Sequence, residues 1–362
     1  MLFDIAIESL PRIVSYQRGQ AAKQAPRDDL RRYIAAQEHV MARLSETTFY
    51  ELARSACSLI YEANLNPVAV ASALPDLRFL AQRSWIEFDS EMRYSACAQS
   101  GQVPPEREGV QPSRMAFFVD CDDDACRKGA IYRFINFKQT FDGDAGAWSR
   151  MGLNSAEDLV RLDRVAFRFD LDDKREASTA EQIARFREEI ARSRAEILER
   201  RTRQGVATPL DKLLDQDDET IAQCMHMSQC FEPHSFGEKG ADLMDQLGNW
   251  AGEQAFLTSF LALLITDVVE TEKSDLAKIN RTRTKKGKPE LRDYITIRLK
   301  RGTAVYKTET EGNGPQGSGT HRRFHLVAGH LRHQPTKNGP KLIWIAPHSR
   351  GKQGAGQRYK VV

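Results

Sequence analysis

The chain has 362 residues, of which 41% are hydrophobic and 28% charged, the composition of a globular protein with room for two or three domains. Its longest apolar run, Ala255–Ile265, is too short to cross a bilayer and predicts a buried helix. The first ten residues lack the basic and apolar segments of a secretory signal, so we expect a cytoplasmic protein with reduced cysteines and no membrane contact.

Charge is distributed unevenly along the chain. Leu276–Val362 holds 20 Lys or Arg residues against 4 Asp or Glu, whereas the rest of the chain holds 33 against 46. This asymmetry predicts a basic module for nucleic acid or another polyanion, attached to an acidic body. A second interpretation is that the basic segment docks on the acidic body of its own chain, because opposite charges also attract within one molecule.

Helical periodicity dominates the first 72 residues. Apolar residues recur with a period near 3.6 in 27–44 and in 47–64, which predicts two helices that form a packing layer. Strand patterns follow at 84–88, 115–120, 130–137 and 165–171. A hairpin loop is expected over 121–128. These elements predict a small antiparallel sheet packed on the N-terminal helices.

The second half begins with the clearest helix, Ser178–Arg203, where Ser178 and Glu181 fit a capping box. The most apolar helix is expected within Glu238–Glu272. A basic linker follows over 277–290, and Leu291–Arg301 alternates like a half-buried strand.

The expected fold class is α+β, a mainly helical acidic body with a small antiparallel sheet, plus a C-terminal basic antiparallel β module. The expected domains are 1–175, with the helical layer and sheet, 176–275, which is helical, and 276–362, the basic module with a flexible tail.

The segment His321–Gly351 holds five of the eight histidines, and its two apolar runs flank a turn at Asn338-Gly339, which predicts a β-hairpin. Metal-free RNA cleavage needs a base, an acid and a cation near the developing phosphorane charge, and histidine titrates near neutrality. The candidate catalytic residues of such a ribonuclease are His325, His330 and His348. The alternatives are that these histidines bind phosphates or satisfy hydrogen bonds in a basic sheet.

Cations of the linker and hairpin form the candidate nucleic-acid-binding set. The linker cannot be a Walker A loop, because it lacks the upstream glycine, the terminal Ser or Thr and a preceding strand. It is expected to contact the phosphate backbone, with a solvated interdomain connection as the alternative. The set consists of Arg281, Arg283, Lys285, Lys286, Lys288, Arg322, Arg323, Arg332, Lys341 and Arg350. Trp344 and Phe324 would stack on bases if they were exposed.

No cofactor and no metal are expected. Cys224, His226, Cys230 and His234 are of ligand type, but on a helix only His226 and Cys230 share a face. We interpret the cysteines as buried and reduced, which is common in protein cores. A metal bound by these residues is the alternative. Glu87, a single acid between apolar residues, is expected to point from its strand to solvent.

Three segments resemble a group of phage and prophage proteins of alphaproteobacterial type that has no assigned activity. The first segment is Trp85-Ile86-Glu87-Phe88. The second is Leu276-Ala277-Lys278-Ile279-Asn280-Arg281-x-Arg283-x-x-x-Gly287-Lys288-Pro289-x-Leu291, running into Tyr294. The third is Arg323-x-His325-x-Val327-x-Gly329-His330-x-Arg332 ending in Trp344-x-x-Pro347-His348-x-Arg350-Gly351. Members of the group often carry Arg where this chain has Ala328. The resemblance implies a mobile-element origin and supplies no mechanism.

The leading hypothesis is a phage-derived protein that binds DNA or RNA through its basic C-terminal module. One alternative is the metal-independent ribonuclease. Another is an inhibitor that binds a host protein, with the acidic body mimicking nucleic acid.

Overall fold

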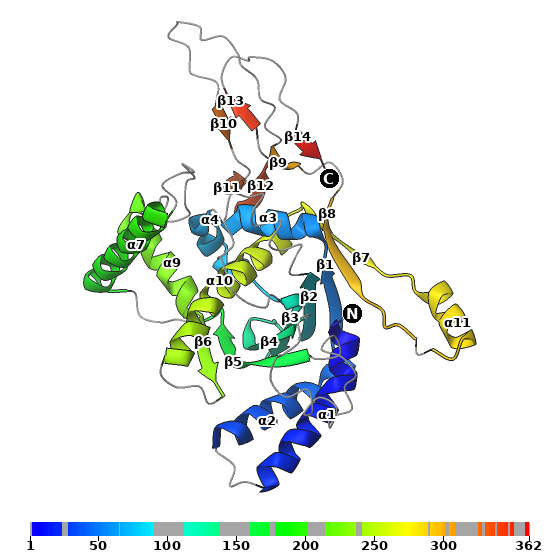
Figure 1. Ribbon diagram of the computed structural model, residues 1–362. Coiled ribbons are helices and arrows are strands. Elements are labelled where there is room, and N and C mark those ends of the chain that lie inside the picture. The colour runs from blue at the N-terminus through cyan, green and yellow to red at the C-terminus, as the bar shows by residue number, and fades with distance from the viewer. Residues whose placement is uncertain are drawn as a thin grey trace, which may run out of the picture.

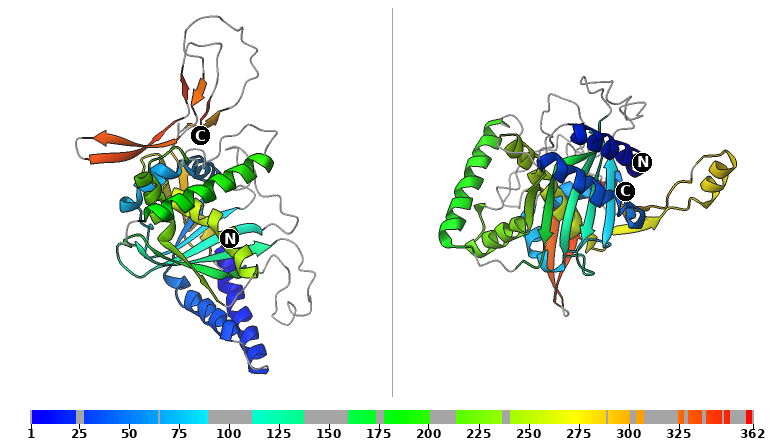
Figure 2. Two further views of the ribbon diagram at one scale, coloured as in Figure 1. Left: turned by 90° about the vertical axis from the view of Figure 1, so that its left-hand side faces the viewer. Right: turned by 90° about the horizontal axis from the view of Figure 1, so that it is seen from below.

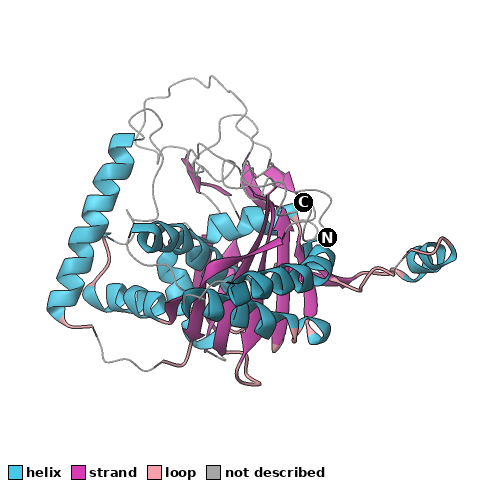
Figure 3. Ribbon diagram, turned by 60° about the horizontal axis from the view of Figure 1, so that its bottom comes forward, coloured by secondary structure: helices cyan, strands magenta, loops and turns pink. Residues whose placement is uncertain are grey.

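The computed structural model describes residues 2–23, 28–64, 66–89, 112–137, 160–173, 178–200, 214–236, 241–288, 290–300, 304–307, 325–327, 330–336, 339–346, 348–350 and 359–361. These residues form an α+β fold, as the sequence predicts, with helices on both faces of a central sheet (Figures 1 and 3).

The central sheet has eight strands in the order β6-β5-β4-β3-β2-β1-β8-β7. The strands are β1 (Thr48–Leu52), β2 (Arg83–Asp89), β3 (Pro112–Cys121), β4 (Lys128–Phe137), β5 (Val160–Asp170), β6 (Phe231–Ser235), β7 (Val269–Lys273) and β8 (Ile295–Leu299). Strand β1 is parallel to both neighbours, β2 and β8. All other pairs are antiparallel, so the sheet is larger than expected and mixed.

Two apolar clusters cover the two faces of this sheet. On one face, α1 (Leu2–Lys23) and α2 (Asp28–Met41) pack on alternate residues that include Phe49, Trp85 and Phe118. On the other, the buried residues come from α3 (Arg54–Asn64), α4 (Pro67–Ser72) and α10 (Ala241–Leu264). Because successive side chains of a strand point to opposite faces of the sheet, the run Trp85-Ile86-Glu87-Phe88 contributes buried residues to both faces.

The remaining elements lie around this core (Figure 2). They are η1 (Leu44–Glu46), η2 (Leu74–Asp76), α7 (Ala180–Arg200), α9 (Asp218–Gln229) and α11 (Ala277–Lys285), and in the C-terminal segment β9 (Ala304–Lys307), β10 (His325–Val327), β11 (His330–Thr336), β12 (Gly339–Ile345), β13 (His348–Arg350) and β14 (Tyr359–Val361). The last six strands pair antiparallel as β10-β13, β11-β12 and β14-β9. None of the described helices has the length and apolar character needed to cross a membrane.

Three predicted elements differ from the structure. The helix expected over 47–64 is β1 followed by α3, because Thr48–Leu52 pairs with two parallel neighbours and buries Phe49 and Tyr50 on opposite faces of the sheet. The capping box of α7 lies one residue later than predicted: Gln182 N donates to Thr179 Oγ1 (3.2 Å) and Thr179 N to Gln182 Oε1 (2.8 Å). The basic segment 277–290, expected to be a linker, begins with helix α11, and β8 is part of the central sheet.

The prediction for Glu87 was wrong, because its carboxylate is fully buried under α1. It accepts hydrogen bonds from Leu2 N (2.9 Å) and Phe3 N (3.2 Å), the first residues of α1. Trp85 Nε1 (3.2 Å) and Arg114 Nε also donate to it. A carboxylate that joins a helix N-terminus, an indole and a guanidinium is electrostatically satisfied inside the core. Glu87 thus fastens α1 to the sheet.

Candidate nucleic-acid interface

A group of exposed cations lies on an arm, which we define as residues 274–294, between β7 and β8. The two strands leave the sheet edge as a two-stranded ribbon that carries α11 away from the body (Figure 1, the right view of Figure 2 and Figure 3). Helix α11 contains no buried residue. An exposed helix without an apolar face must be stabilised by something other than core packing.

Local hydrogen bonds stabilise α11 at its ends and along one side. Asp275 Oδ1 accepts from Ala277 N (3.3 Å) at the start of the helix. At its end, Lys288 N donates to Arg283 O (2.9 Å) and Gly287 N to Thr284 O (3.0 Å), with Gly287 at φ +65°. This pair of bonds is a Schellman motif, whose left-handed residue is most easily glycine.

The return segment covers one side of α11. Asn280 Nδ2 donates to Leu291 O (2.8 Å) while Asn280 Oδ1 accepts from Leu291 N (2.7 Å). One turn later, Thr284 Oγ1 donates to Glu290 Oε1 (3.0 Å). These three bonds fix the rotation of the helix about its axis, so the side opposite Asn280 and Thr284 faces away from the return segment.

Lys278 and Lys285 lie on this outer side and Arg281 on the flank between it and Asn280, because each residue turns an α-helix by about 100°. All three are exposed. Within the described part of the chain, no carboxylate forms an ion pair with them. An open groove of about 490 Å³ runs beside Arg281 and Lys285. Lys286 and Lys288 add two more exposed cations at the end of α11. The arm therefore holds uncompensated positive charge at a fixed orientation.

The base of the arm is also held in place. Arg298 forms ion pairs with Glu270 (2.9 Å) and Glu272 (2.8 Å) across the ribbon, and Ser274 N donates to Tyr294 O (2.8 Å). The guanidinium of Arg292 lies 5.3 Å from the ring centre of Phe3. These contacts fix the orientation of the arm relative to the body.

The second group of predicted cations lies on the β11–β12 hairpin, far from the arm in Figures 1 and 2. This hairpin docks on the body through Leu331, Leu342 and Trp344, which are buried in the core, and Asn66 Nδ2 donates to Leu331 O (2.9 Å). Trp344 is only 8% exposed, so it packs in the core and offers no base-stacking surface. Arg332 and Lys341 are exposed.

The three candidate catalytic histidines belong to two separate ribbons. Val327 pairs with His348 and His325 with Arg350 in β10–β13, whereas His330 pairs with Ile345 in β11–β12. Their backbones are described, but the side chains of His325, His348 and Arg350 lie outside the described part, as do Arg322, Arg323 and Phe324 altogether. The ribonuclease and the host-protein inhibitor therefore stay predictions.

The residues of metal-ligand type around α9 are spread over the end of a helix and the start of a strand. Cys224 and Cys230 are buried free thiols, His226 is half-buried in α9 and His234 is exposed in β6. Burial raises the pKa of Cys224 to about 11, which keeps its thiol protonated. Among the described residues, no three His, Cys, Asp or Glu side chains gather closely enough to hold a metal ion.

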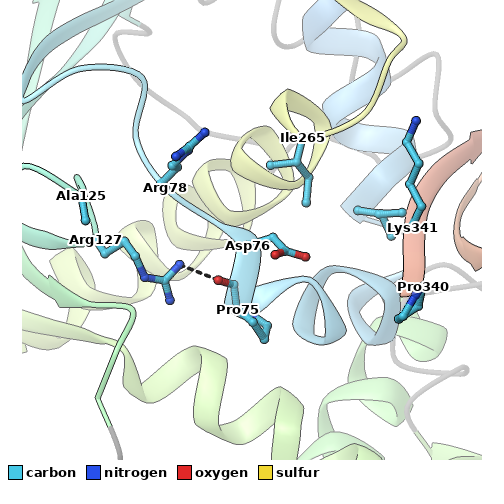
Figure 4. Close-up of a pocket in the computed structure, with 9 residues that line it drawn as sticks. Pro75, Asp76, Arg78, Ala125, Arg127, Ile265, Pro340 and Lys341 are labelled. Atoms are coloured by element: carbon cyan, nitrogen blue, oxygen red, sulfur yellow. Dashed lines mark hydrogen bonds between the residues drawn. The ribbon is translucent and has the colours of Figure 1, made fainter. Parts of the chain in front are cut away.

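A second cavity of about 490 Å³ lies where the hairpin meets the body (Figure 4). Of the cations that line it, Arg127 uses all five N–H donors internally, to Asp172 and to the carbonyls of Pro75, Leu77, Leu74 and Leu171. Arg78 and Lys341 remain, with the carboxylate of Asp76 beside them. A carboxylate, Glu290, also lines the groove beside α11, but the arm exposes more cations than the two available in this cavity.

Comparison with known proteins adds no further constraint: no family model, curated protein or solved structure matches this chain.

The structure places Arg281, Arg283, Lys285, Lys286 and Lys288 on the arm, Arg332 and Lys341 on the β11–β12 hairpin and Arg350 in β13, and it adds Lys278, which the sequence did not indicate. Lys278 lies one turn before Arg281, so the helical spacing would have found it had α11 been recognised. Two signals of that helix are present in the sequence: Asp275 before its first residue and Gly287 just beyond its last.

Proposed function

We propose that this protein binds nucleic acid through its arm, with Lys278, Arg281 and Lys285 contacting phosphates. The observation that carries the proposal is that α11 exposes these cations on one side, unpaired by any described carboxylate, on a rigid support away from the body. Cations held in this way release counterions from a polyanion when they bind it, which gives a sequence-independent and salt-sensitive affinity.

The local energetics of α11 support a binding role. Arg281 and Lys285 are like charges at i and i+4, a spacing that destabilises a helix by about 0.2–0.5 kcal/mol. Helix α11 has no buried residue to offset this repulsion. A surface helix under selection for stability alone would place opposite charges at this spacing. A bound polyanion would instead screen the repulsion between Arg281 and Lys285 and attract both side chains, so that the two charges would stabilise the complex.

The rigidity of the arm supports the same role. Because the hydrogen bonds of Asn280 and the Schellman motif already order α11, binding would not have to order it, and the cost of association would be lower. Arg332 and Lys341 stay predicted contacts on a separate surface.

An arm deletion tests the proposal. Ser274 and Tyr294 already face each other as a hydrogen-bonded pair, so residues 275–293 can be replaced by Asn-Gly, which forms a two-residue hairpin turn. Affinity for a fluorescent mixed-sequence DNA duplex would be measured by anisotropy at low and moderate salt. The proposal predicts that the deletion removes most of the salt-dependent affinity.

A comparison variant is Arg332→Ala with Lys341→Ala, which leaves the arm intact and measures how much of the affinity comes from the two exposed cations of the hairpin. Thermal unfolding of each variant, followed by circular dichroism, verifies that the body still folds. Equal affinity of the wild type and a folded arm-deleted chain would overturn the proposal. So would an absence of salt-dependent binding to DNA and RNA in the wild type.

A further inference from the structure

We infer, on the basis of the proposed function, that the ligand of the arm is a B-form DNA duplex and that the outer side of α11 enters its major groove. Three features of the arm lead to this assignment: its shape, the chemistry of its side chains and the position of its cations. The shape argues against duplex RNA, the chemistry argues against single strands, and the cation positions fit a phosphate backbone along the groove.

The shape of the arm matches a wide groove. An α-helix with its side chains is about 10–12 Å across, and the major groove of B-form DNA is about 12 Å wide. Contacts with the return segment occupy only the side of α11 that bears Asn280 and Thr284. The opposite side is free to enter such a groove. The major groove of an A-form RNA duplex is too deep and narrow for side chains of a helix to reach its floor.

The chemistry of the arm argues against single strands. Proteins that hold single-stranded DNA or RNA stack its bases on aromatic side chains, and unpaired bases also stack on arginine planes. Between Asp275 and Asp293 the sequence contains no Phe, Tyr, Trp or His. Tyr294, the nearest aromatic residue, packs at the arm base with its ring 6.1 Å from that of Phe49. The arm therefore lacks an aromatic stacking platform.

The cations are placed to grip the backbone along the groove. Lys278 and Lys285 are seven residues apart, which at 1.5 Å per residue separates their Cα atoms along the helix by about 10 Å. Lys286 and Lys288 extend the positive charge past the C-terminal end. At that end the helix dipole is negative, so these lysines also offset its repulsion of phosphates. Arg281 lies between the two lysines along the helix axis, on the flank that also borders Asn280 and Thr284.

Three ligands of equal length separate the outcomes: a DNA duplex of about two helical turns, the RNA duplex of the same sequence and one DNA strand alone. The full chain would be titrated with each at one salt concentration. The DNA duplex should bind at least about tenfold more tightly than the RNA duplex, although both duplexes carry dense phosphate charge. Charge alone would not produce that preference.

Groove occupancy provides the second readout. Glucosylated 5-hydroxymethylcytosine fills the major groove of the duplex, whereas netropsin occupies the minor groove. The inference predicts a large loss of affinity on the glucosylated duplex and little change with netropsin. Equal or tighter binding of the RNA duplex or the single strand would overturn the inference, as would displacement by netropsin, and both results would leave the proposed function standing. If none of the three ligands bound, both would fall.

Discussion

Removal of two positive charges from α11 gives the sharpest quantitative prediction. In the variant Arg281→Ala/Lys285→Ala, both changed residues are exposed and neither has an ion-pair partner among the described residues. Alanine is the strongest helix former, and the change also relieves an i,i+4 repulsion. Helix α11 should therefore persist, and any loss of affinity reports on binding.

The magnitude follows from counterion release. Each phosphate contact on B-form DNA contributes about 0.9 to the slope of log K against log salt concentration, so two lost contacts should lower the slope by about 1.8. Between about 50 and 200 mM salt, the affinity advantage of the wild type over the variant should then shrink about tenfold. Anisotropy titrations of a labelled duplex across this range measure both slopes.

The matched control is Arg185→Ala/Arg192→Ala on α7, which also removes two exposed cations from an exposed helical surface. It changes the net charge of the chain by the same amount, so its slope should stay close to that of the wild type. If the α7 and α11 variants lowered the slope equally, the arm would not be the site, and binding would depend only on net charge.

Three further predictions concern the arm and the body. Asn280→Ala removes both hydrogen bonds to Leu291, so the free energy of local unfolding of the arm should fall by about 1–3 kcal/mol. Its amide hydrogens should then exchange faster, as measured by mass spectrometry, while the thermal midpoint of the whole chain stays unchanged. Unchanged exchange would contradict the role of Asn280. Glu87→Gln leaves Arg114 without its buried partner and should lower the free energy of unfolding in urea by about 3–5 kcal/mol. Glu51→Gln, which affects a partly exposed contact to the same guanidinium, should cost less than about 1 kcal/mol, and equal losses would refute this account. Folding raises the pKa of Cys224 from 9.0 to about 11, so the unfolded state loses that proton first as the pH rises. The free energy of unfolding of the wild type, relative to that of Cys224→Ala, should therefore fall between these two pH values. Parallel curves of unfolding free energy against pH for the two chains would argue against this effect.

The antiparallel half of the sheet was predictable because its signals are local. Strands β2 to β5 show alternating or aromatic runs, and the hairpin loop over 121–128 connects two of them directly. Strand β1 was missed because its partners are distant in sequence: Tyr50 pairs with Ile86 on one side and with Ile295 on the other. A short segment placed between such strands carries little local pattern of its own.

The candidate site was predicted in part, and the missing part has a physical cause. Five of its cations were identified from charge alone, but α11 was not, because a helix that buries nothing shows no apolar period. Glu87 was misjudged for a related reason. Its burial is offset by Arg114 and by the backbone of Leu2 and Phe3, which are 27 or more residues away in sequence. Tertiary contacts of this kind leave no trace in local periodicity.

Lysine footprinting tests the central claim most directly. The full chain would be acetylated briefly with and without excess DNA duplex, and the modification of each lysine measured by mass spectrometry. The account predicts that DNA protects Lys278, Lys285, Lys286 and Lys288, whereas Lys300, an exposed lysine just beyond β8, keeps its reactivity. If the arm lysines reacted equally with and without bound DNA, the arm would not be the interface.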